Sequence, residues 1–292
     1  MKEYIQILKD VIDGDVHENR TSQNTRRVWG KEFRHDLSQG FPLLTTKKMA
    51  YKACFAELIG FLRGETDVRW YRSHGCRIWD SDHKRWHTKD LERDISVWRV
   101  NGDPLLEESI KHRTENPFSL GEIYGYQWRN FANSGYDQLA QIVSAIRDGS
   151  NSRRLIMSAW APNRFHMMCL PPCHVSYHFV IDGCRLNIMC YQRSCDTPLG
   201  VPFNIASTAL LCHIVANSAG LFPGEMVWYG DDVHIYENQV GQAEKQIKRK
   251  PMKLPRLLLA EEFKDPWEVE VSDISVLDYN HHGRISFPLT VS

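Results

Sequence analysis

The sequence predicts a single α+β domain over residues 1–292. Three observations support this. Apolar residues at helical spacing occur in segments that are interspersed with short β-rich runs. Two of these runs, 175–181 and 186–191, flank a tight turn at Asp182-Gly183, as in a β-hairpin. No internal repeat, low-complexity stretch or linker divides the chain.

The first half of the chain alternates helical and extended patterns. Apolar residues at helical spacing predict the first helix, and an amphipathic pattern that carries Glu57 and stops at Gly64 predicts the second. In order, we expect a helix over residues 1–12, a polar loop at 17–23, a strand at 27–33, a turn at 38–40 and a helix at 51–62.

Residues 81–118 are rich in charge and weakly patterned, so we expect an irregular insertion that forms a solvated surface lobe. A long segment at 203–219, ended by Gly220, is apolar on all sides and predicts a buried helix. The remaining expected elements are a helix within 135–148 and strands at 155–160, 175–181, 186–191, 226–228 and 255–259.

Composition narrows the function classes. The 36 basic and 36 acidic residues cancel, which gives no support for nucleic-acid binding. The eight cysteines are scattered without a CxxC pair, so we expect reduced thiols, no bound metal and a cytoplasmic location. The N-terminus lacks a signal-peptide pattern, and no apolar stretch approaches 18 residues, so we expect no membrane partner.

The most reactive combination of residues surrounds Cys173 in the run LPPCH. A thiol becomes a nucleophile when positive charge or hydrogen-bond donors favour the thiolate. Arg193 lies just after the second hairpin strand, and antiparallel pairing would bring it toward Cys173. The sequence therefore predicts thiolate attack on an anionic substrate. The alternative is that Cys173 is a small buried core residue.

Four arginines are candidate anion ligands, because the guanidinium fork suits phosphate oxygens. They are Arg20, Arg153, Arg154 and Arg193. If Arg153 and Arg154 occupy consecutive strand positions, their side chains point to opposite faces. The pair would then serve or reach across a subunit interface, and the alternative is a solvated surface pair.

Asn204 carries an amide that matches the imide edge of uracil, although a helix cap is the commoner role for such a residue. His234 and Tyr236 alternate along an extended segment and so share a face. Glu57 is a candidate buried acid, for proton relay or for structural pairing.

The motifs LPPCH, YQRSCD, LGVPFNIAS and HIY, in this order, resemble those of the thymidylate synthase family. Further matches are RT at 20–21, FPLLTTKK at 41–48, IWD at 78–80, IYGYQWR at 123–129 and SRRLIMSAW at 152–160. The resemblance implies a large mixed β-sheet flanked by helices and a homodimer formed through the sheet face. It also implies the substrates dUMP and 5,10-methylenetetrahydrofolate.

The resemblance further implies a role for each site residue. Cys173 would add to C6 of the pyrimidine, and Asn204 would read the uracil edge, since relatives that act on deoxycytidylate carry aspartate there. Glu57 would organise water and protons, supported by His174 and Tyr124. The phosphate would be held by Arg20, Arg193 and Ser194, with Arg153 and Arg154 from the partner subunit. His234 and Tyr236 would bind the deoxyribose, and Trp79, Leu170, Asp196 and Gly200 the folate.

The chain departs from the family pattern at several positions. The loop that normally reads RTGTGT is RTSQNT here, and the tail is ISFPLTVS. Single-residue departures are Gly60 for tryptophan, Glu122 for proline, Ala161 for asparagine and Thr208 for tyrosine. The residues for the pyrimidine are kept while those near folate differ, so two products are open: dTMP, or 5-hydroxymethyl-dUMP if water adds to the methylene. A non-catalytic RNA-binding or structural relative is disfavoured by the complete set of catalytic-type residues.

Overall fold

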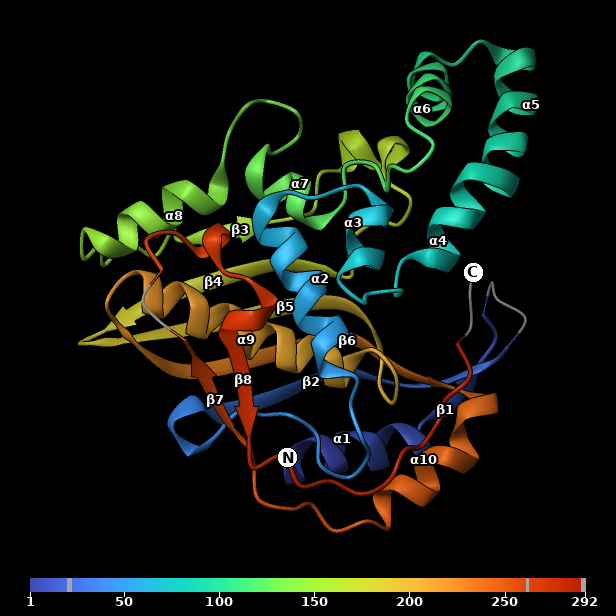
Figure 1. The fold of residues 1–292 in the computed structure, drawn as a ribbon. Coiled ribbons are helices and arrows are strands. Elements are labelled where there is room, and N and C mark those ends of the chain that lie inside the picture. Colours follow the sequence, from blue (N-terminus) through green and yellow to red (C-terminus); the bar gives the residue numbers. More distant parts are fainter. Residues whose placement is uncertain (20–22, 261–262, 290–292) are drawn as a thin grey trace.

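A six-stranded mixed sheet forms the centre of the molecule, with strand order β1-β2-β6-β5-β4-β3 (Figure 1). The computed structural model describes residues 1–19, 23–260 and 263–289. Strands β5 and β6 pair in parallel, and the other neighbours are antiparallel. The strands are β1 (Asp15–His17), β2 (Thr25–Asp36), β3 (Ile156–Ser158), β4 (His174–Asp182), β5 (Arg185–Asp196) and β6 (Phe222–Tyr236), with a separate pair β7 (Arg256–Leu259) and β8 (Ile274–Leu277).

Helices cover one face and the ends of this sheet (Figure 1). Helix α2 ends at Arg63, and the predicted stop, Gly64, follows it in the left-handed conformation. The α-helices are α1 (Lys2–Ile12), α2 (Tyr51–Arg63), α3 (Val68–Ser73), α4 (Asp80–Arg85), α5 (Leu91–Asn101), α6 (Pro104–Glu115), α7 (Tyr124–Arg129), α8 (Gln138–Arg147), α9 (Val201–Ser218) and α10 (Val240–Ile247).

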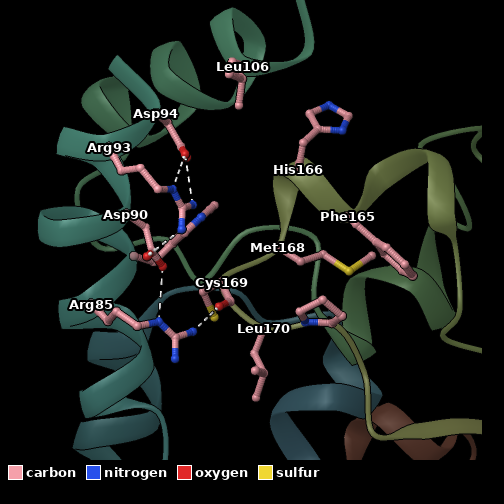
Figure 2. A pocket seen from close by; sticks show the side chains of 12 residues that line it. Arg85, Asp90, Arg93, Asp94, Leu106, Phe165, His166, Met168, Cys169 and Leu170 are labelled. Atoms are coloured by element: carbon pink, nitrogen blue, oxygen red, sulfur yellow. Dashed lines mark hydrogen bonds and ion pairs between the residues drawn. The ribbon is translucent and has the colours of Figure 1, made fainter. Parts of the chain in front are cut away.

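The expected irregular insertion is helical, so that prediction was wrong. Residues 80–115, here called the helical lobe, consist of α4, a π-helical turn at Trp86–Asp90, α5 and α6. The lobe extends away from the sheet (Figure 1), and it and residues 165–171 together line a cavity of about 430 Å³ (Figure 2). Its buried positions are partly polar, and apolar periodicity therefore did not reveal the helices.

Arg113 holds the lobe together from inside. Its side chain is fully buried and donates to the Asp94 carboxylate at 2.7 Å and to the Trp86 carbonyl at 3.1 Å. Removing one member of a buried ion pair leaves the other charge uncompensated. We expect Arg113→Met to lower the free energy of unfolding by about 3 kcal/mol in chemical denaturation. Arg93→Met, which removes the exposed partner of the same carboxylate, should cost less than about 1 kcal/mol; equal losses would contradict this role for Arg113.

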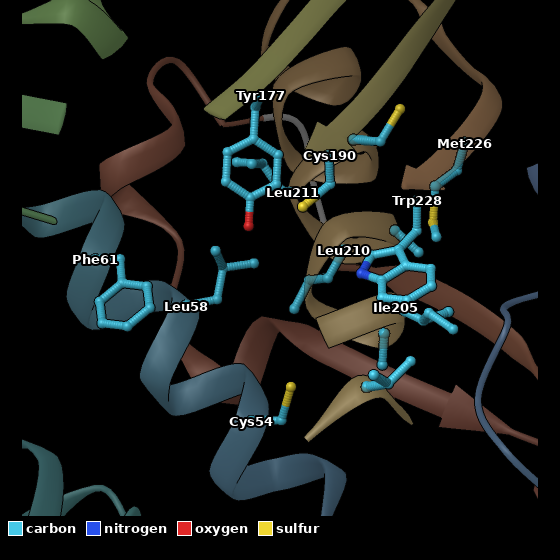
Figure 3. Packing of buried hydrophobic residues seen from close by; sticks show 14 of the residues in the cluster. Cys54, Leu58, Phe61, Tyr177, Cys190, Ile205, Leu210, Leu211, Met226 and Trp228 are labelled. Carbon is cyan, nitrogen blue, oxygen red and sulfur yellow. The ribbon is translucent and has the colours of Figure 1, made fainter. Parts of the chain in front are cut away.

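Helix α9 connects the two parallel strands and is the centre of the hydrophobic core. Ile205, Leu210 and Leu211 on α9 pack between the sheet, represented by Trp228, and helix α2, represented by Leu58 (Figure 3). In the described part of the chain, α9 alone is long and apolar enough to cross a bilayer, but 78% of it is buried within the protein. It is therefore a core helix, as its all-round apolar pattern predicts.

The opposite face of the sheet carries exposed apolar side chains together with charged ones such as Glu32 and Arg34. Along β5, Ile188 and Cys190 point into the core, whereas Met189 between them is exposed, as strand alternation requires. The large apolar side chains exposed on the sheet strands include Trp29, Ile156, Val180, Met189 and Tyr229. Several exposed large apolar side chains on one sheet face are a feature of protein–protein interfaces.

Several element boundaries differ from the predictions, and some of these differences affect the site. Strand β6 spans Phe222–Tyr236 rather than 226–228, so the HIY motif lies within it. Helix α9 starts at Val201, with Pro202 in its first turn, where a missing N–H costs nothing. Arg153 and Arg154 lie in a turn before β3, so the condition that would place their side chains on opposite faces of a strand is not met.

Candidate active site

Cys173 lies immediately before β4 and is half-buried. Its N–H donates to the hydroxyl oxygen of Tyr124 at 2.7 Å, and its carbonyl accepts from the Arg193 N–H at 2.9 Å. The hairpin therefore brings Arg193 to Cys173 as predicted. Burial raises the pKa of the Cys173 thiol, and the Arg193 charge opposes that rise. The isolated chain thus holds Cys173 as a thiol rather than as a preformed thiolate.

The Arg193 guanidinium is oriented by backbone carbonyls of the LPPC run. Its Nε donates to the Pro172 carbonyl at 2.9 Å and its Nη2 to that of Pro171 at 3.0 Å. The guanidinium carbon also lies 5.1 Å from the centroid of the Trp160 ring. Among the described residues no carboxylate forms an ion pair with Arg193, so its charge is available for an anionic ligand.

An amide chain orients Asn204. Gln192 is buried, and its Nε2 donates to Asn204 Oδ1 at 3.0 Å, while its Oε1 accepts from Trp228 Nε1 at 2.7 Å. Because the Gln192 amide is fixed by the indole donor, the Asn204 side chain has a defined orientation. Asn204 lies within α9, whose N-cap is Gly200, so the helix-cap alternative was wrong.

His174 is neutral at neutral pH. Burial lowers its pKa to about 4, and its Nδ1 lies 3.1 Å from the Tyr177 hydroxyl. A neutral imidazole next to Cys173 cannot stabilise a thiolate by charge. Its contribution is therefore that of a polar, orienting neighbour.

Glu57 points from α2 into an aromatic environment. Burial raises its pKa to about 7, and the side chain forms no ion pair with a basic residue of the described chain. The Trp79 side chain is a hydrogen-bond partner of Glu57, so both the proton-relay and the structural-pairing readings stay predictions. Tyr124 and Trp79 are buried near it and contact each other with ring centroids 6.0 Å apart. A buried acid that titrates near neutrality suits proton transfer.

Asp196 is linked to the C-terminal segment by a residue that sequence reasoning missed. Gln239 Nε2 donates to Asp196 Oδ2 at 3.2 Å and to the Pro288 carbonyl at 3.0 Å. Lys47, also missed, donates to the Pro198 carbonyl and lies 4.6 Å from the Phe287 ring centroid. The segment that precedes the C-terminus therefore runs beside Asp196.

Parallel pairing aligns the ends of β5 and β6. Asp196 is in register with His234, and Ser194 with Asp232. The rings of His234 and Tyr236 are 5.5 Å apart, which confirms that these residues share a face. The paired residues at the ends of these two central strands are therefore polar: Ser194, Asp196, Asp232 and His234. They lie close to the start of α9.

The remaining predicted residues have different outcomes. Gly200 lies next to Asn204, because a Cβ there would be in ordinary van der Waals contact with Asn204 Oδ1 at 3.5 Å. Leu170 lines the cavity beside the helical lobe (Figure 2). Arg153 and Arg154 are exposed and form no ion pair or hydrogen bond to Cys173 or Arg193 within this chain. Arg20 and the altered positions 21 and 22 lie outside the described residues.

Comparison with known proteins gives a consistent result over the full length. The family model described as thymidylate synthase matches residues 2–291. The thymidylate synthase of Mycoplasma mobile is 38% identical over 297 aligned residues and that of Malacoplasma penetrans 38% over 298 residues, with all of both chains covered in each case.

Proposed function

Because this chain belongs to the thymidylate synthase family of one-carbon transferases, we propose that it transfers a one-carbon unit to C5 of dUMP through a covalent adduct between Cys173 and C6. The observation that carries this proposal is the backbone hydrogen bond that joins Cys173 to Arg193. It places a thiol next to a guanidinium that has no carboxylate partner among the described residues. The proposed product is dTMP with dihydrofolate.

The proposed chemistry starts from the thiol. Binding of dUMP closes the site, Cys173 loses its proton, and its sulfur adds to C6 while electron density moves toward O4 of the base. Asn204, oriented by Gln192, binds the imide edge where that charge develops, and the protonated carboxyl group of Glu57 supplies a proton through water. The phosphate is held by Arg193 and Ser194, by Arg20, and by Arg153 and Arg154 of a second subunit. His234 and Tyr236 bind the 3′-hydroxyl.

The folate site fits the residues present. The buried Trp79 indole lies beside the Glu57 carboxyl group, and Gly200 lies next to Asn204. Trp79, Leu170, Asp196 and Gly200 would hold the ligand, with residues 287–288 nearby. When bound, 5,10-methylenetetrahydrofolate supplies the carbon unit and, for a methyl product, the hydride. The proposal requires no metal.

The uncovered sheet face supports a homodimer. Exposed Met189, Tyr229 and Trp29 would be buried by a second copy. Mixing inactive Cys173→Ala and Arg154→Ala proteins should restore part of the activity, because mixed dimers contain one complete site. Failure to recover activity would contradict donation of Arg154 across the interface. We propose a cytoplasmic enzyme that binds neither nucleic acid nor membrane.

Mass analysis of the nucleotide product tests the proposed reaction. Incubation with dUMP and 5,10-methylenetetrahydrofolate should yield dTMP and dihydrofolate. Formation of 5-hydroxymethyl-dUMP with tetrahydrofolate would instead establish the dUMP hydroxymethylase alternative. Absence of any product under conditions where dUMP binds would contradict both.

The pH dependence should depend on Glu57. Since its raised pKa is about 7, the protonated acid predominates below that pH and is lost above it. We expect kcat/KM of the parent to fall with pH through an ionisation near 7, and Glu57→Gln to lose this limb together with about 10²-fold of activity. Glu107→Gln, an exposed charge change, should leave the profile unchanged. Persistence of the limb in Glu57→Gln would assign it to another group.

A further inference from the structure

The helical lobe contacts the segment that carries the nucleophile. Residues 162–173, here called the nucleophile segment, start with a 3₁₀ turn at Pro162–Met167 and end at Cys173. The lobe forms one wall of the cavity in Figure 2, and residues 165–171 of the nucleophile segment form the other. Hydrogen bonds from the lobe reach the nucleophile segment at two separate places.

The first connection involves Glu108 on α6. Its carboxylate accepts from Arg164 Nη2 and from His166 Nε2, both at 2.9 Å, and the hydroxyl of Ser109 donates to the His166 carbonyl at 2.5 Å. Arg164 also forms an ion pair with the buried carboxylate of Glu122. Glu122 stands where the family usually has proline, so this departure supplies the acid that anchors Arg164.

The second connection involves Arg85 at the end of α4. Its Nη2 donates to the Cys169 carbonyl at 2.9 Å (Figure 2). Asp82 and Asp90 each lie 3.1 Å from other nitrogens of the same guanidinium, which fixes its direction. A carbonyl four residues before Cys173 is thus held by a preoriented donor.

We infer that the helical lobe positions Cys173 by clamping the nucleophile segment at Arg164 and at Cys169, and that Glu108 and Arg85 are positioning residues. Neither residue needs to touch substrate. If the backbone were free to move at Arg164 or at Cys169, the Cys173 sulfur would shift relative to the base ligands on β5, β6 and α9. Small displacements of this kind cost large factors in rate.

Glu108→Ala tests the inference against a closely matched control. Glu107→Ala removes the same charge from the adjacent exposed position of α6, and the Glu107 side chain forms no hydrogen bond or ion pair in the described chain. We expect Glu108→Ala to lower kcat about tenfold, while KM for dUMP changes less than threefold because the phosphate and base ligands lie elsewhere. Glu107→Ala should match the parent.

Thiol alkylation gives a readout that is independent of turnover. Cys184 is exposed and serves as an internal reference for Cys173 in peptide mapping after iodoacetamide treatment. We expect the rate ratio of Cys173 to Cys184 to rise at least threefold in Glu108→Ala, because the nucleophile segment loosens, and to stay unchanged in Glu107→Ala. Equal ratios or equal kcat values in the two variants would overturn the inference.

Arg85→Lys is a second, independent variant that keeps the charge. A lysine cannot reproduce the planar fork that reaches Asp82, Asp90 and the Cys169 carbonyl together, so kcat should again fall without a matching change in KM. The positioning inference rests on the proposed role of Cys173. The alkylation result tests the inference separately from the proposed function. A raised ratio in a chain that makes no product would support the clamp and reject the proposed function.

Discussion

Replacing Cys173 with serine will lower kcat/KM for dUMP by about 10³-fold or more while the protein remains folded. A serine hydroxyl is far less acidic than a thiol. The surroundings do not compensate, because burial lowers the pKa of His174 to about 4 and the neighbouring imidazole is therefore uncharged at neutral pH. Steady-state assays of product formation measure the loss.

Cys184→Ser is the control for this substitution. Cys184 is exposed in the β4–β5 turn, so its replacement should leave kcat/KM within a factor of two of the parent. Calorimetric binding of dUMP to Cys173→Ser should remain within about tenfold, since phosphate and base ligands are unchanged. More than a tenth of the parent activity in Cys173→Ser would contradict a covalent role for the thiol.

Asn204→Asp should invert the choice of base. A carboxylate accepts but does not donate, so it cannot satisfy O4 of uracil, whereas it can accept from the amino group of cytosine. Gln192 Nε2, which donates to Asn204 Oδ1, would still orient the new side chain. We expect kcat/KM for dUMP to fall about 10²-fold or more, and binding of dCMP to become tighter than that of dUMP.

A surface amide provides the comparison for this second variant. Asn101→Asp, at the exposed end of α5, adds the same negative charge far along the chain from the site and should leave the preference unchanged. Competition binding with dUMP and dCMP measures the ratio directly. If Asn204→Asp retains the parent preference for dUMP, another residue reads the base edge.

Local patterns were sufficient to predict much of the fold. The alternation in 175–191 predicted the β4–β5 hairpin, and the all-round apolar character of 203–219 predicted the buried helix α9. The helical lobe was missed because Arg113 and Asp94 occupy positions where apolar residues would reveal periodicity. A buried ion pair links two of its helices, α5 and α6, and sequence spacing does not show that contact.

In the candidate site too, contacts between residues in local elements could be predicted, whereas contacts between residues far apart along the chain could not. The pairing of Cys173 with Arg193 followed from a hairpin of local contacts, and the structure confirms it. Gln239 and Lys47 were missed because their partners lie 43 to 151 residues away along the chain. Gly60, a departure from the family, is also explained only in three dimensions, since a Cβ there would lie 2.4 Å from the ring of Tyr71.

Helix α9 follows β5 and precedes β6 along the chain, and this order has a consequence for synthesis of the protein. The ribosome completes this apolar helix before it makes β6, so one side of α9 stays uncovered while the next elements emerge. An uncovered apolar helix is a site for chaperone binding and for aggregation. We therefore expect chains truncated after residue 220 to accumulate as insoluble material. Substitutions that delay docking of β6 should lower soluble yield more than they lower the stability of molecules that have folded.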